Sequence, residues 1–123
     1  MILAVALPAV GGGCAVLVVG GVAAAGVGTY AYVSGEMKGT EAVALDRAWD
    51  AAQAAMKDLE FSVTSKAKDA LQAELTARTA ADKKIQIRLK KVTDGATEVR
   101  IRVGTFGDES LSRLILTKMK SHF

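Results

Sequence analysis

Residues 83–103 read KKIQIRLKKVTDGATEVRIRV, and this stretch decides the fold. Apolar and polar side chains alternate on both sides of Asp94-Gly95, a dipeptide that favours tight hairpin turns. The pattern predicts two antiparallel strands with one apolar and one polar face, because successive side chains of a strand point to opposite sides. The apolar positions are Ile85, Ile87, Leu89, Val99, Ile101 and Val103.

The flanking sequence supplies the other predicted elements. Residues 61–66 and 71–78 also alternate and are joined by short turns, which is typical of an antiparallel meander. Apolar residues at steps of three and four predict amphipathic helices over 45–59, with Trp49 in the core, and over 111–119, capped by Asp108. Residues 30–38 are predicted to form one further strand. The expected fold is therefore α+β and two-layered: an antiparallel five-stranded sheet with two helices on one face, in the order strand, helix, four strands, helix.

The N-terminal segment differs sharply from this domain. All 16 basic and 13 acidic residues lie after Ser34, and the first residues are apolar and rich in Gly and Ala. A short apolar run that ends in small residues is typical of a secretory signal. A cysteine directly after them can accept a diacylglycerol and palmitate. We therefore predict a signal peptide over 1–13, a lipidated Cys14 with an apolar tether over 14–33, and the α+β domain over 34–123.

A second interpretation of the same segment stays open. Residues 14–33 carry no charge, and a helix of this length would span roughly 30 Å, the thickness of a bilayer core. Gly12, Gly20, Ala24 and Gly28 would form a stripe of small residues, which allows membrane helices to approach closely. The alternative is thus an integral membrane protein with an uncleaved, oligomerising helix and a structural cap domain.

Four motifs are similar to a known family: YAYV at 30–33, RAWDA at 47–51, FSV at 61–63 and IRVGTFGDE at 101–109. They resemble a family of small, functionally uncharacterised bacterial lipoproteins. The resemblance implies secretion and lipidation of Cys14. The residue after Cys14 is Ala15 and not the Asp that retains many such proteins in the inner membrane. The resemblance therefore also implies an outer-membrane location facing the periplasm. The order of elements resembles the helix-grip domains of an outer-membrane assembly lipoprotein, in fold only.

Residues suited to catalysis or metal binding are few. Cys14 is the only cysteine and lies in the apolar segment, while His122, the only histidine, is next to the last residue. Neither glycine cluster has the form of a phosphate-binding loop. We therefore predict that the protein is not an enzyme and holds no cofactor or metal.

The polar face of the predicted sheet carries the candidate binding residues. Alternation places Arg88, Lys90, Arg100 and Arg102 on the side away from the helices. Such a stripe could bind anionic lipid headgroups or an acidic protein, although a solvated face with cross-strand pairs to Glu74 and Glu98 is the simpler interpretation. Nucleic acid is disfavoured, because no stacking aromatics lie between the charges. The expectation is a cell-envelope lipoprotein with a small binding or assembly domain. Its expected partners are the membrane, through the lipid anchor, and an envelope protein or a second copy of the chain.

Overall fold

The computed structural model describes residues 18–19, 22–23 and 28–123. Cys14, the predicted signal and half of the predicted tether lie outside these residues. Strands β2 (Val18–Val19) and β3 (Val22–Ala23) form a short antiparallel pair.

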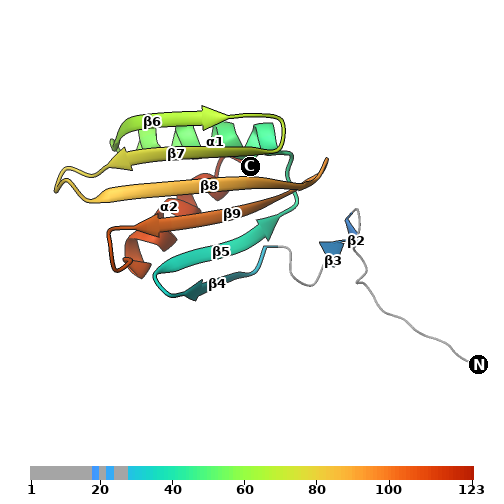
Figure 1. The fold of residues 1–123 in the computed structure, drawn as a ribbon, viewed down its shortest axis with the longest axis horizontal. Helices are drawn as coiled ribbons and strands as arrows, with labels where there is room; N and C mark the ends of the chain where they lie inside the picture. The colour runs from blue at the N-terminus through green and yellow to red at the C-terminus, as the bar shows by residue number, and fades with distance from the viewer. Residues whose placement is uncertain (1–17, 20–21, 24–27) are drawn as a thin grey trace, which may run out of the picture.

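The domain is built on one antiparallel sheet in the order β4-β5-β9-β8-β7-β6 (Figure 1). Its strands are β4 (Tyr30–Val33), β5 (Glu36–Glu41), β6 (Ser62–Lys68), β7 (Gln72–Arg78), β8 (Lys84–Thr93) and β9 (Ala96–Val103). β6 to β9 form the predicted meander, in which each strand pairs with the next. On its other side β9 pairs with β5, which comes earlier in the chain. The antiparallel α+β class is thereby confirmed.

The number of strands differs from the prediction, because the sheet has six strands and not five. The single strand expected over residues 30–38 is a hairpin of β4 and β5. Ser34 and Gly35 have φ values of 54° and 83°, and positive φ at both central residues is the mark of a type I′ hairpin turn. The sheet consequently starts at Tyr30, within the range assigned to the apolar segment.

Two helices, α1 (Leu45–Asp58) and α2 (Glu109–Lys120), cover one face of the sheet (Figure 1). α1 lies over β7 and β8, α2 lies over β9 and β5, and the two helices contact each other. The Asp108 side chain accepts a hydrogen bond from the Leu111 amide at 3.0 Å, which confirms the predicted cap of α2. Within the described ranges, neither helix is both long and apolar enough to cross a membrane.

The core fills the space between the helices and the sheet. All six apolar positions predicted on β8 and β9 are buried. Trp49 is only half-buried at the edge of the core, because α1 faces the sheet with small residues. The residues of α1 that are buried are Leu45, Ala48, Ala51, Ala52, Ala55 and Met56. Leu71, predicted in a strand, lies in the turn between β6 and β7 and is 66% exposed.

Candidate binding surface

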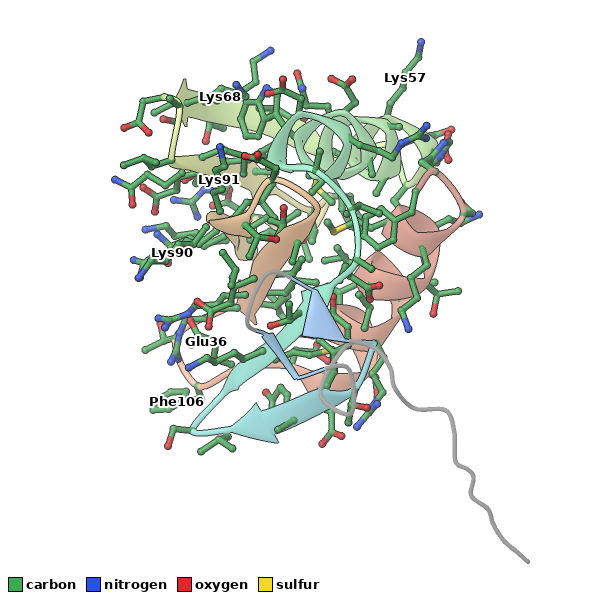
Figure 2. The ribbon with its side chains drawn as sticks, turned by 90° about the vertical axis from the view of Figure 1, so that its right-hand side faces the viewer. Glu36, Lys57, Lys68, Lys90, Lys91 and Phe106 are labelled. Carbon is green, nitrogen blue, oxygen red and sulfur yellow. The ribbon has the colours of Figure 1, made fainter. Side chains whose placement is uncertain are left out.

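The helices leave the second face of the sheet uncovered, and we call it the open face. It consists of the residues of β4 to β9 that alternate with the buried positions. Figure 2 shows Lys90 and Phe106 projecting on this side, whereas Lys57 of α1 projects on the side of the helices. Basic side chains outnumber acidic ones on the open face: Lys38, Arg78, Lys84, Arg88, Lys90, Arg100 and Arg102 stand against Glu36, Glu74 and Glu98.

The four candidate residues lie on the open face, on its two central strands. Arg88 and Lys90 of β8 are exposed, and Arg100 and Arg102 of β9 are half-buried. The register places Arg88 directly opposite Arg100. Like charges in this position repel each other, so neighbouring acidic groups have to compensate them.

Two glutamates provide this compensation in the middle of the open face. Glu74 accepts a hydrogen bond from Arg88 Nε at 3.2 Å, and Glu98 accepts one from Arg100 Nε at 3.2 Å. Glu98 also lies 3.7 Å from Lys38 Nζ, which reaches it from β5. The cross-strand pairs of the alternative interpretation are therefore present at Arg88, which pairs with Glu74 of β7, and at Glu98, which pairs with Lys38 of β5. The Arg100–Glu98 pair lies within β9 itself. Because the pairs are solvent-exposed, each contributes only about 0–1 kcal/mol to stability.

Other cations of the open face lack such a partner. Among residues 28–123, no carboxylate lies within 4.0 Å of the terminal nitrogens of Lys84, Lys90 or Arg102. Arg102 Nη2 instead donates to the backbone oxygen of Ser34 at 3.0 Å, across the β4–β5 turn. The sequence pattern already contained Lys84, which continues the alternation of β8. Lys38 joins the face only through the β5–β9 pairing, which the sequence did not reveal.

Two exposed apolar side chains lie at the same end of the sheet as Arg102, and we call Val33, Arg102 and Phe106 the corner of the open face. Glu36 of β5 stands between Val33 and Arg102 in the register. The side chains of Val33 and Phe106 are 65% and 93% exposed. The β4–β5 turn packs against the loop between β9 and α2: a Cβ atom on Gly35 would lie 2.9 Å from the Phe106 oxygen and 3.0 Å from Arg102 Nη1. The corner joins segments about 70 residues apart in the chain, so sequence patterns could not assemble it.

Two hollows mark the open face. One of about 510 Å³ is lined by Glu74, Arg88, Lys90, Glu98 and Arg100, among others. The second, of about 520 Å³, lies along β4 and β5 and includes Ala31, Val33 and Lys38. Glu98 lines both. The open face thus offers paired charges in its middle and a more apolar margin along β4.

A partly buried polar cluster lies on the opposite side of β4, beneath α2. Burial raises the pKa of the Tyr30 hydroxyl far above its usual value, and the adjacent Glu41 carboxylate raises it further. Lys120 of α2 approaches both groups, with Nζ 3.9 Å from Glu41 Oε2 and 5.4 Å from the centre of the Tyr30 ring. The cluster joins β4 and β5 to α2, and the raised pKa keeps the Tyr30 hydroxyl protonated.

Few groups of the described residues are arranged for chemistry. In that part of the chain, no three His, Cys, Asp or Glu side chains gather closely enough to hold a metal ion. His122 Nε2 lies 2.7 Å from Asp58 Oδ2 and joins the C-terminus to α1. This hydrogen bond lowers the pKa of Asp58.

Comparison with known proteins identifies the family. Residues 1–122 match a family model described as "Protein of unknown function (DUF3568)". The chain belongs to this family. The match includes the N-terminal segment as well as the sheet and both helices, so this combination is a feature of the family model. No curated protein matches the chain.

Proposed function

We propose that this protein is a cell-envelope lipoprotein, held at the outer membrane and facing the periplasm, whose domain is a non-catalytic binding or assembly module. The observation that carries the binding role is the open face, which neither helix covers and on which basic side chains of β5, β7, β8 and β9 outnumber acidic ones. A solvated sheet face needs no excess of one charge, whereas a surface for an anionic partner does.

The attachment of the domain supports the anchoring role. The Gly28 amide donates to the Thr40 oxygen at 2.6 Å, so the hydrogen bonds between β5 and the chain before β4 extend to this residue. About 14 residues separate Gly28 from Cys14, and a chain of that length spans at most about 50 Å. An acyl group on Cys14 would therefore hold the open face within reach of the membrane surface.

Intact-mass measurement of the protein extracted from its native membrane tests the anchor. We expect a chain that begins at Cys14 and carries the mass of its acyl groups. The Cys14→Ser variant should keep its signal peptide and lack this mass. An unmodified wild-type chain that still begins at Met1 would contradict the proposal and support the uncleaved membrane helix.

A further inference from the structure

We propose that the open face docks on an anionic lipid surface, with Phe106 and Val33 entering the headgroup region and Arg102 and Lys84 contacting phosphates. This inference rests on the proposed function, because the lipid anchor brings the domain to the bilayer. It adds the identity of the partner and the residues that enter it.

The first argument is that Phe106 is held away from the protein. The glycines on either side of its loop, Gly104 and Gly107, have φ values of 72° and 87°. The loop is packed closely at its base, where the Phe106 oxygen nearly contacts Gly35. The backbone is thereby fixed while the aromatic ring is 93% exposed. Exposed single apolar residues are common, but a closely packed loop that presents a whole aromatic ring at the same end of the sheet as a second exposed apolar residue is suited to an apolar environment.

The second argument is the charge around the corner. Arg102 belongs to the corner itself, and Lys84 lies at the same end of the sheet, where the Gly104 amide donates to the Lys84 oxygen at 2.7 Å. Among residues 28–123, no carboxylate lies within 4.0 Å of the terminal nitrogens of either side chain. Glu36 stands opposite both Arg102 and Val33 in the register, so Arg102 and Lys84 together leave the corner with an excess of one positive charge. Aromatic and aliphatic groups flanked by Lys or Arg are suited to the bilayer interface. The apolar groups contact the acyl chains there, and the basic groups contact the phosphates.

The third argument separates a lipid surface from a protein partner. Phe106 lines neither of the two hollows and projects from the domain (Figure 2). A projecting aromatic ring requires a complementary pocket on a protein, whereas a fluid headgroup region accepts it without one. β4 also connects the corner to the N-terminal segment, because Val33 ends the strand that begins two residues after Gly28. When β4 lies along the bilayer, the anchor and the corner reach it together.

The experiment uses the full, membrane-extracted protein reconstituted into vesicles, with tryptophan as a reporter of depth. Trp49 is first replaced by Phe, and Phe106→Trp is then introduced. Leu71→Trp provides the matched control, because Leu71 is also an exposed turn residue but lies outside the corner. Lipids brominated on the acyl chains quench only a tryptophan that enters the bilayer.

We expect strong quenching of Trp at 106 in vesicles with anionic lipid, weaker quenching in zwitterionic vesicles, and none at 71. The double variant Lys84→Gln/Arg102→Gln should reduce the docked population about 25-fold, since each cation near an anionic surface favours binding about fivefold. Lys57→Gln/Lys118→Gln, which removes the same charge from the helix side, should leave the quenching unchanged. High salt should weaken docking in the same way as the double variant.

Flotation of the same vesicles at high salt separates this inference from the proposed function. Protein that floats at high salt but shows no quenching at 106 at low salt overturns lipid docking and leaves the open face to an acidic protein partner. Equal quenching at 71 and 106 also overturns it, because the corner would then have no special role. Protein that does not float at all contradicts the lipid anchor itself, and docking that rests on the anchor fails with it.

Discussion

Gly107→Ala is the most informative single substitution in this fold. Gly107 has a φ of 87°, and a Cβ atom there would lie 2.7 Å from the Gly35 oxygen and closer still to the Gly35 Cα atom and the Tyr32 hydroxyl. Most of these atoms belong to backbone, which cannot move aside without opening the contact between the β4–β5 turn and the loop before α2. The substitution therefore tests whether this contact holds β4 in the sheet.

The expected cost has two parts. A left-handed conformation costs an L-residue about 1–2 kcal/mol. An added methyl group in a closely packed position costs about 1–3 kcal/mol more. The two costs together amount to about 2–5 kcal/mol. This is a large share of a small domain's free energy of unfolding, which is typically about 5–15 kcal/mol.

Substitutions at two other glycines of the same chain distinguish the cost of the left-handed backbone from the cost of the close contact. Gly28 has a φ of 80° but open space around its Cβ position, so Gly28→Ala should cost only the backbone strain. Gly95 has the same open space without a positive φ, and Gly95→Ala should be neutral or stabilise the fold by up to about 1 kcal/mol. Urea unfolding of a soluble chain from residue 24, followed by Trp49 fluorescence, measures all three. If Gly107→Ala costs no more than Gly28→Ala, the close contact at Gly35 has no energetic weight and the reasoning is refuted.

Three further outcomes are expected with the same soluble chain. Starting the chain at Ser34 removes β4 and should lower the free energy of unfolding by roughly 2–4 kcal/mol, the value for two half-buried tyrosines; an unchanged urea midpoint would mean that β4 is dispensable. Ile87→Ala, fully buried in β8, should cost about 2–5 kcal/mol, whereas Val92→Ala, 42% exposed, should cost much less. Hydrogen bonding to the Leu111 amide and to Lys83 lowers the pKa of Asp108, so its contribution is present above the unfolded pKa and is lost as pH falls through the folded value. Asp108→Asn should therefore show a shallower loss of stability between about pH 5 and 2 than the parent; parallel curves would contradict this role.

The central part of the fold could be predicted from sequence because its signals are local. The alternation around Asp94-Gly95 identified β8, β9 and their buried face, and Asp108 marked the start of α2. The hairpin of β4 and β5 was missed, because alternation continues across Ser34-Gly35 and two positive φ values leave little trace in the pattern. Trp49 was placed too deeply, since the regular spacing identified a helix face without showing that alanines form its centre.

The candidate binding surface was predictable only within single strands. Arg88, Lys90, Arg100 and Arg102 follow from the period of two along β8 and β9. The ion pair between Lys38 and Glu98 depends on which strands are neighbours, because the β5–β9 pairing that brings these residues together is not between consecutive strands. The corner is even harder to predict from the sequence, because it arises from a contact between two turns.

The edge position of β4 also determines how the domain responds to a pulling force. Among the described strands, β4 is hydrogen-bonded only to β5, and the chain enters it at Gly28. Tension between the membrane and a bound partner would act on this end first, and an antiparallel edge strand peels away one hydrogen-bonded pair at a time. Peeling as far as Ser34, where Arg102 holds the turn, would release about 20 Å of chain. The other five strands and both helices would remain folded, so β4 would act as an extensible link that yields before the core does.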